Sequence, residues 1–376
     1  MLTVEKIDTR NKAQVRRFVS NPYRLYAKCK QWVPPLLMDV NTQLNREKHP
    51  FYEHSDADFF IVARDRRDVG RIAVLENKPF NKYHGTHKAN IYLFECEDDQ
   101  EAANALFERV FDWAKGRSLD TIVGPKGFSP FDGYGMLVEG YEHRQMMMMM
   151  NYNYPYYNTL VQNLGFEKEV DFVSCYINKT IFQMPERVHS IAKRVEERGV
   201  LKVVKFKSKR EMIKNWAPKI ARLYNDTFIN NWEYYPLSDR EIFFAVDNVL
   251  VVADHHLIKL IMNDDTIVGF VFAFPDISAA LQRARGHLLP FGLPDMLLEL
   301  KRTKWLSLNG AGILPEFQGH GGNALLYAEM EKTLTDTRFT DAELTQVAET
   351  AVQMRRDLVN LGGKPYKNHR VYTKHL

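Results

Sequence analysis

The chain has 376 residues, of which 45% are hydrophobic and 26% charged, and its formal net charge is +4. This length favours two domains over one, and so small a positive charge argues against nucleic acid as a partner. The odd number of cysteines shows no disulfide or metal-binding spacing, which indicates a reducing compartment. No signal-peptide core and no run of about 18 apolar residues occurs, so we expect a cytoplasmic protein.

Two stretches of the chain share one plan. DFFIVARDRRDVGRIAVLE, residues 58–76, predicts a strand, a tight turn and a return strand, and LIKLIMNDDTIVGFVFAFP, residues 257–275, predicts the same. The glycines that open the return strands, Gly70 and Gly269, are 199 residues apart. A repeated fold is the simplest explanation of such a match.

A second landmark recurs at almost the same offset. Residues 156–179 predict a helix that stops at Gly165 and an alternating strand, and residues 351–374 predict the same order with the stop at Gly362, an offset of 197 residues. Each half therefore predicts helix, hairpin, strand, helix, strand, helix and a terminal strand. We expect an α/β (α+β) protein of two like domains, 1–183 and 184–376.

The most informative stretch for chemistry is Trp305 to Leu334, WLSLNGAGILPEFQGHGGNALLYAEMEKTL. It predicts an apolar strand, a turn at Pro315, a glycine-rich loop and a helix from Asn323. Glycines before a helix expose backbone N–H groups at the positive end of the helix dipole, which suits a pyrophosphate. A purely structural glycine turn is the alternative.

This stretch resembles the acyl-CoA loop of the GNAT superfamily, whose pattern is Arg/Gln-x-x-Gly-x-Gly/Ala. Gln318 and Gly321 match that pattern, while Asn323 replaces its last small residue. The resemblance implies two tandem GNAT-like domains, each with a mixed, mostly antiparallel twisted sheet flanked by helices. It also implies acyl-CoA as co-substrate, held by residues from the strand end, the loop and the helix start: Ile313, Leu314, Gln318, Gly319, His320, Gly321, Gly322, Asn323 and Ala324.

The equivalent place in the first half, ANIYLFECEDDQEAANALFERVFDWAKG, keeps the strand and the helix but has no glycines at the turn. Carboxylates crowd the turn instead: Glu95, Glu97, Asp98, Asp99 and Glu101. These groups suit a helix amino terminus but would repel a pyrophosphate. We therefore expect that the first domain lacks the CoA site.

Over nearly the whole chain, segments such as HPFYEHSDADFFIVARD, GPKGFSP and NYNYPYYNTLVQNLGF resemble one bacterial family of tandem GNAT-like proteins. The chain is similar to the bacterial ceramide synthases. That similarity implies an acyl-CoA-dependent N-acyltransferase whose acceptor is a primary amine, a long-chain sphingoid base. Two alternatives stay open: a degenerate pair that binds without catalysis, and a transferase that uses aminoacyl-tRNA.

N-acyl transfer needs a base for the amine proton and a donor for the thioester oxyanion. In the superfamily a strand N–H, here around Gly312 to Leu314, serves the oxyanion. Glu343 is our first choice of base and Glu349 the second. The tyrosine that protonates the leaving thiolate in relatives is replaced by Leu358, so Tyr366 or Tyr372 would have to substitute. We expect no metal, because His255 and His256 would point oppositely on a strand.

A last feature lies between the second hairpin and the loop. Residues 277–306 carry many leucines between flanking cations, among them Arg283, Arg285, Lys301, Arg302 and Lys304. Such a segment suits peripheral contact with the anionic inner membrane surface or a lid over an acyl chain. A buried connecting helix is the alternative.

Overall fold

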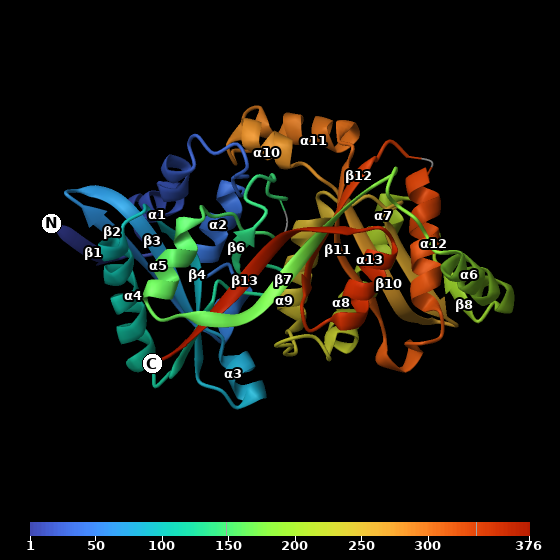
Figure 1. Cartoon of the computed structure of the whole chain (residues 1–376), viewed down its shortest axis with the longest axis horizontal. Coiled ribbons are helices and arrows are strands. Elements are labelled where there is room, and N and C mark those ends of the chain that lie inside the picture. Colours follow the sequence, from blue (N-terminus) through green and yellow to red (C-terminus); the bar gives the residue numbers. More distant parts are fainter. Residues whose placement is uncertain (148, 336) are drawn as a thin grey trace. The chain divides into compact units, whose positions relative to one another are not determined.

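The computed structural model describes residues 1–147, 149–335 and 337–376. It divides into two compact units, each a sheet flanked by helices, which confirms the predicted fold class (Figure 1). The first unit holds residues 1–173, 278–296 and 367–376, and the second holds 174–277 and 297–366. The predicted domains, 1–183 and 184–376, describe the two sequence repeats and stay a prediction. The compact units divide the chain differently, because two later segments join the first unit.

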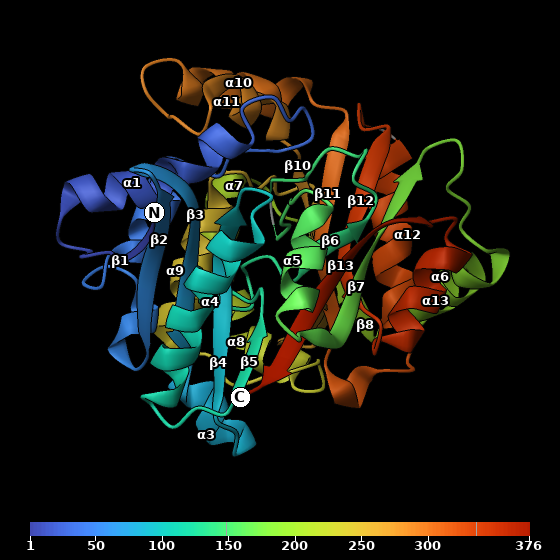
Figure 2. The same ribbon diagram turned by 60° about the vertical axis from the view of Figure 1, so that its left-hand side comes forward.

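The sheet of the first unit has the strand order β1-β2-β3-β4-β5-β13, and β6 also pairs with β13. Its strands are β1 (Leu2–Lys6), β2 (Asp56–Arg64), β3 (Arg67–Glu76), β4 (Lys88–Cys96), β5 (Thr121–Gly124) and β6 (Met136–Glu139). Its helices are α1 (Lys12–Leu25), α2 (Leu37–Leu44), the 3₁₀ turn η1 (Pro50–Glu53), α3 (Lys78–His84), α4 (Gln100–Lys115), α5 (Tyr156–Asn163) and α10 (Ser278–Ala284). Helix α4 lies across one face of β2 to β4 (Figure 2).

The second unit has the strand order β12-β11-β10-β9-β8. Its strands are β8 (Leu201–Val203), β9 (Ile258–Asn263), β10 (Thr266–Pro275), β11 (Trp305–Ile313) and β12 (Asp341–Ala348). Its helices are α6 (Glu186–Arg198), α7 (Lys209–Glu211), the π turn η2 (Met212–Trp216), α8 (Ala217–Phe228), α9 (Asp239–Leu250), the 3₁₀ turn η3 (Pro315–Phe317), α12 (Gly322–Thr335) and α13 (Val352–Asn360). Helix α11 (Gly292–Arg302) and strands β7 (Glu167–Asn178) and β13 (Lys364–His375) contribute residues to both units.

The predicted repeat is visible in the strand irregularities. In the β2–β3 hairpin one extra residue, Val69, interrupts the register, and in the β9–β10 hairpin the extra residue is Val268. The two bulges are 199 residues apart, which is the offset that the sequence predicted. A bulge twists and bends a strand, so the same bend recurs in both sheets.

The terminal strands are exchanged between the repeats. β13, which ends the second repeat, pairs antiparallel with β5 of the first unit, from Tyr372↔Gly124 to His375↔Thr121. β7, which ends the first repeat, is the neighbour of β12 in the strand order. Period-two alternation predicts that these segments are strands but does not name their partners. The sequence therefore missed this exchange.

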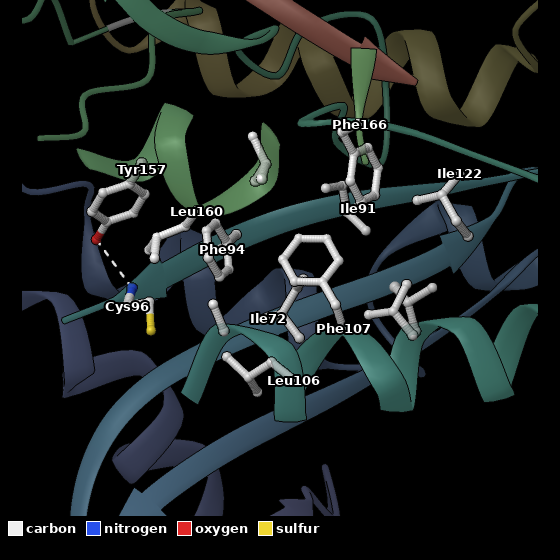
Figure 3. Close-up of a cluster of buried hydrophobic side chains, with 14 of the residues drawn as sticks. Ile72, Ile91, Phe94, Cys96, Leu106, Phe107, Ile122, Tyr157, Leu160 and Phe166 are labelled. Atoms are coloured by element: carbon white, nitrogen blue, oxygen red, sulfur yellow. Dashed lines mark hydrogen bonds between the residues drawn. The ribbon is translucent and has the colours of Figure 1, made fainter. Parts of the chain in front are cut away.

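One core of the first unit lies between the sheet and α4. Leu106 and Phe107 of α4 are fully buried against Ile72 and Ile91 of the strands, and Phe166 packs on Phe107 with ring centroids 5.3 Å apart (Figure 3). Helix α4 begins at Asp99, whose carboxylate accepts from the Ala102 N–H at 3.1 Å. This cap satisfies one of the N–H groups that a helix start leaves without an intrahelical acceptor.

The buried His369 of β13 makes stability of the first unit depend on pH. Burial lowers the pKa of His369 to about 4, although its Nε2 lies 3.0 Å from the Asn151 carbonyl, which favours the charged form. Below pH about 6.5 the unfolded chain binds a proton that the folded chain does not, so stability falls as the pH drops toward 4.

We expect the free energy of unfolding to fall by about 2 kcal/mol between pH 7 and pH 5 because of this residue. Denaturant titrations of the wild type and of His369→Gln at both pH values measure the effect. The difference between the two proteins isolates His369 from the carboxylates that titrate in the same range. Parallel stability curves for the two proteins would contradict the assignment.

Candidate functional site

The candidate site in the second unit begins where two parallel strands stop pairing. β11 and β12 are in register from Trp305↔Asp341 to Leu308↔Leu344, and β11 continues to Ile313. The register of β10 with β11 skips one residue of β11, Asn309, just past this point. The parallel pair therefore ends at a bulge, and the last part of β11 pairs only with β10 among the strand registers of the described residues.

Beyond the bulge, backbone N–H groups of β11 alternate between the two sides of the strand. The Leu314 N–H donates to the Val268 carbonyl at 2.9 Å. Because Gly312 is two residues earlier in the same strand, its N–H also points toward β10. The N–H groups of Ala311 and Ile313 then lie on the side that β12 has left. Of the two predicted strand-end residues, Ile313 but not Leu314 offers a backbone donor there.

The glycine loop connects β11 to α12. The Gln318 side chain donates through Nε2 to the Ile313 carbonyl at 3.2 Å, which ties the loop to the end of the strand. Gly319 and Gly321 have φ values of +79° and +82°. L-residues with a side chain rarely adopt this left-handed region, so both positions favour glycine. His320 and Asn323 are exposed.

Helix α12 starts at Gly322, and the Leu325 N–H donates to the Gly321 carbonyl at 3.2 Å. The N–H groups of residues 322–324 come before this first intrahelical hydrogen bond, as at any helix start. The first turn of α12 contains no acidic residue. The predicted positive helix end is therefore present.

The two loop glycines differ in their surroundings. A Cβ at Gly321 would lie 2.7 Å from Val195 and 2.9 Å from Ile191 of α6, whereas a Cβ at Gly319 would meet nothing within 4 Å. α6 packs on α12 through Ala192, Ala324 and Ala328. Substitution at Gly321 would disturb this helix pair, so Gly319 is the position at which the loop can be altered without a clash.

The structure brings two predicted catalytic residues together. The Tyr366 hydroxyl donates to Oε2 of Glu343 in a short hydrogen bond. Glu343 is fully buried and faces Ser307 of β11 across the parallel pair. Glu343 is therefore not a solvated carboxylate at a strand end.

Aromatic side chains surround this pair. Tyr176 lies with its ring centroid 5.9 Å from that of Tyr366 and 5.5 Å from that of Trp305. Its hydroxyl donates to Asp341 at 2.5 Å. Burial raises the pKa of the neighbouring Cys175 thiol to about 11, so this cysteine stays protonated at neutral pH and is a poor nucleophile.

The other predicted catalytic positions lie elsewhere. Glu349 follows the end of β12 in the turn before α13. Leu358, which stands where the resemblance implies a tyrosine, is buried, and its carbonyl accepts from the Gly363 N–H at 2.9 Å. Tyr372 belongs to the first unit, where its hydroxyl donates to Asn158 at 2.8 Å. Only Tyr366 of the two substitute tyrosines contacts a candidate base.

The sequence missed Asn309 and Thr227. Both amide atoms of Asn309, at the bulge, and the Thr227 hydroxyl of α8 are buried without a hydrogen-bond partner in the described part of the chain. Thr227 lies against Gly312, where a Cβ would be 2.2 Å from its methyl group. Buried polar groups are nearly always paired, so these groups lack a partner that the fold would ordinarily supply. The N-G-A-G sequence of 309–312 was the available signal.

Comparisons with known proteins agree with this geometry. No family model matches the chain. It is 28% identical over 378 residues to "Bacterial ceramide synthase" of Caulobacter vibrioides, covering 98% of this chain and 97% of that protein. It is 24% identical over 372 residues to "Protein YghO" of Escherichia coli, covering 97% and 94%. Among solved structures it resembles a tandem GNAT protein from the clavulanic acid biosynthesis pathway, with a TM-score of 0.57, 11% identity and coverage of 100% and 98%.

The chain has the GNAT fold. The first repeat also has two parallel strands that stop pairing. β4 and β5 are parallel from Lys88↔Thr121 to Asn90↔Val123, and an extra residue in β4 shifts the register between β3 and β4 just beyond. Past that shift, the Cys96 N–H at the end of β4 donates to the Tyr157 hydroxyl at 3.1 Å (Figure 3).

Side chains of the chain itself thus occupy this place in the first repeat. The Tyr157 and Tyr26 hydroxyls donate to Glu95 at 2.9 and 2.7 Å. Burial raises the pKa of Glu95, and Arg71 opposes that rise. The Asp99 carboxylate caps α4, and Arg64 pairs with it at 2.7 Å. The sequence predicts that the acidic turn repels a diphosphate, but arginines balance part of its negative charge. The stronger reason to expect no diphosphate here is that the Asp99 carboxylate already occupies the start of α4.

The prediction that His255 and His256 lie on a strand is wrong. The structure places them in a turn before β9, not on a strand, and their rings lie 3.9 Å apart. With Asp254 they offer ligand atoms within 4.8 Å of one another. Acidic and histidine groups at an exposed turn are common without an ion, so the absence of a metal from the reaction stays a prediction. Separately, no helix in the described residues is long and apolar enough to cross a membrane.

Replacing Asn309 with leucine should separate its role in activity from its role in stability. Leucine is similar in size and removes a buried amide that has no partner within the chain, so the free energy of unfolding should rise or change by less than about 1 kcal/mol. Acyl transfer should fall at least tenfold if the amide contacts substrate. Denaturant titration and an acyl-transfer assay measure both. A large loss of stability with unchanged activity would show a structural role instead.

Proposed function

We propose that the second repeat transfers an acyl chain from acyl-CoA to the primary amine of a long-chain sphingoid base. The observation that carries this proposal is the contrast between two equivalent helices. α4 is capped by its own Asp99, whereas α12 begins with glycines and has no acidic residue in its first turn. A free helix amino terminus binds a diphosphate through its N–H groups and its dipole.

The residues that would hold the donor come from one continuous segment. N–H groups of the loop and the first turn, from Gly319 to Ala324, would bind the diphosphate, and the exposed His320 and Asn323 would contact it from the side chain. The N–H of Ala311 or Ile313 would donate to the thioester oxygen. Gln318 would act indirectly, because its amide holds the strand end and the loop together.

The chemistry needs one base and one acid. The amine nitrogen attacks the thioester carbon, the carbonyl oxygen takes the electron pair, and collapse breaks the C–S bond. Glu343 would accept the proton that the amine loses. Tyr366, hydrogen-bonded to Glu343, would give its proton to the thiolate and regain one from Glu343. This relay needs no group at Leu358.

The identity of the acceptor is supported by the relative from Caulobacter vibrioides, whose name states ceramide synthesis and which matches 98% of this chain. An amide bond to a sphingoid amine is the reaction that this name describes. The coverage of both chains means that both repeats and the connecting segments are included in the similarity.

A charge placed in the loop tests the donor site. Gly319→Asp adds a carboxylate where a Cβ meets nothing, and Gly319→Asn adds the same volume without charge. Both residues tolerate the left-handed conformation. Calorimetric titration with palmitoyl-CoA should show at least a tenfold weaker affinity for the aspartate variant and a smaller effect for asparagine. Equal affinities for both variants and the wild type would place the diphosphate elsewhere.

Glutamine replacements test the base. Glu343→Gln keeps the volume of the buried side chain, and we expect kcat to fall at least a hundredfold with palmitoyl-CoA and sphinganine, measured by mass spectrometry of the amide product. Tyr366→Phe should lower kcat about tenfold. Glu349→Gln is the matched comparison, and a larger loss there than at Glu343 would move the base to Glu349. Thermal melts of each variant identify a loss that is due to unfolding.

The same assay separates the alternatives. Acetyl-CoA and aminoacyl-tRNA are offered as donors beside palmitoyl-CoA. Transfer from aminoacyl-tRNA alone would support the tRNA-dependent reading. Tight binding of long-chain acyl-CoA without turnover for any amine would support a binding module.

A further inference from the structure

The second repeat contains a helical hairpin that the first repeat lacks. Between β3 and β4 the first repeat has only α3, whereas residues 276–304 of the second repeat form α10, a turn and α11. In Figure 1 these two helices are drawn in orange. The segment was expected to contact a membrane, to cover an acyl chain or to be buried.

One end of the hairpin is held firmly within the first unit. The Gln282 side chain donates to the carbonyls of Lys30 and Trp32 at 2.8 and 2.9 Å. The Gly286 carbonyl accepts from the Leu37 N–H at 3.1 Å, and a Cβ at Gly286 would lie 2.3 Å from the Pro35 carbonyl. These contacts fix the base from which the turn and α11 extend.

The other end exposes apolar side chains. Leu289 and Phe291 in the turn are 78% and 81% exposed. On α11, Leu293, Leu297 and Leu298 are exposed, while Met296 is buried. A buried connecting helix would show the opposite pattern, so that alternative is wrong. Five large exposed apolar side chains within residues 289–298 form a contiguous stretch rather than the single scattered residues that are normal on a surface.

Cations border this stretch. Lys301 and Arg302 follow Leu297 and Leu298 by one helical turn and so lie on the same side of α11. Lys304 and, before the turn, Arg285 are also exposed. Arg283 is balanced by Asp295, to which it donates at 2.8 Å. The charge that remains available on the segment is positive.

We propose that residues 285–304 dock the protein on an anionic bilayer. Leu289, Phe291 and the exposed leucines of α11 enter the interface, and the lysines and arginines contact the headgroup phosphates. Charge complementarity favours a bilayer over an acyl chain or a second copy of the chain, because neither of those accounts for the bordering cations. This docking rests on the proposed function insofar as the sphingoid amine is itself a membrane lipid.

Vesicle binding of the full chain tests docking without reference to catalysis. We would measure sedimentation of the protein with vesicles of phosphatidylcholine alone and with vesicles that contain 30% phosphatidylglycerol, a composition chosen to give about the charge of a natural anionic membrane. We expect at least tenfold stronger binding to the anionic vesicles and a loss of that preference in 0.5 M salt, a concentration at which screening acts over about 4 Å.

Three variants sharpen the test. The double variant Leu289→Asp with Phe291→Asp, and the double variant Lys301→Glu with Arg302→Glu, should each weaken binding to anionic vesicles at least tenfold. The matched control is Val251→Asp, which places the same charge at another exposed apolar residue, outside the hairpin. Binding of that control should stay within twofold of the wild type.

The outcomes distinguish docking from catalysis. Acyl transfer in detergent-dispersed substrate should be unchanged in the hairpin variants and reduced only when the amine is presented in vesicles. No vesicle binding by the wild type, or equal loss in the control, would overturn docking while leaving the acyl-transfer proposal intact. Dimerisation of the wild type that Leu289→Asp with Phe291→Asp abolishes, without vesicle binding, would assign the surface to a second copy and also overturn it.

Discussion

The separation of two parallel strands is the constraint on which the candidate site depends. β11 and β12 pair from Trp305 to Leu308, and the bulge at Asn309 then bends β11 away. Backbone N–H groups that would otherwise close a parallel ladder are left available on β11. The same bend delivers the glycine loop and the start of α12 next to these groups, because the loop follows only a few residues later. A site built from main-chain donors tolerates extensive change in side chains.

The two repeats show how the same framework gains or loses a site. In the first, Tyr157 receives the N–H at the end of β4 and Asp99 caps α4, so side chains satisfy the groups that a ligand would satisfy. In the second, glycines leave the helix start open. An open helix end and a buried amide at Asn309 cost stability in the second, and the proposed substrates would complete the hydrogen bonding there.

Several features followed from local pattern alone. Period-two alternation with turn residues predicted both hairpins, and nearly equal offsets between landmarks predicted the repeat. The structure added the matching bulges at Val69 and Val268, which the sequence had not predicted. The glycine loop was predictable because positive φ at Gly319 and Gly321 demands a residue without a Cβ. The absence of glycines at Asp98 and Asp99 likewise predicted a different turn in the first repeat.

The sequence by itself determined the elements, their repetition and the place of the loop, since these depend on interactions among residues near in the chain. The tertiary structure decided which strand completes which sheet, which tyrosine donates to Glu343, and which carbonyl accepts the hydrogen bond of the Leu314 N–H. It also decided that the leucines of 289–298 face outward. Each of these depends on partners far apart in the chain, such as Tyr366 with Glu343 and β13 with β5. Local periodicity gives the orientation of a side chain relative to its own element but not the group that it meets.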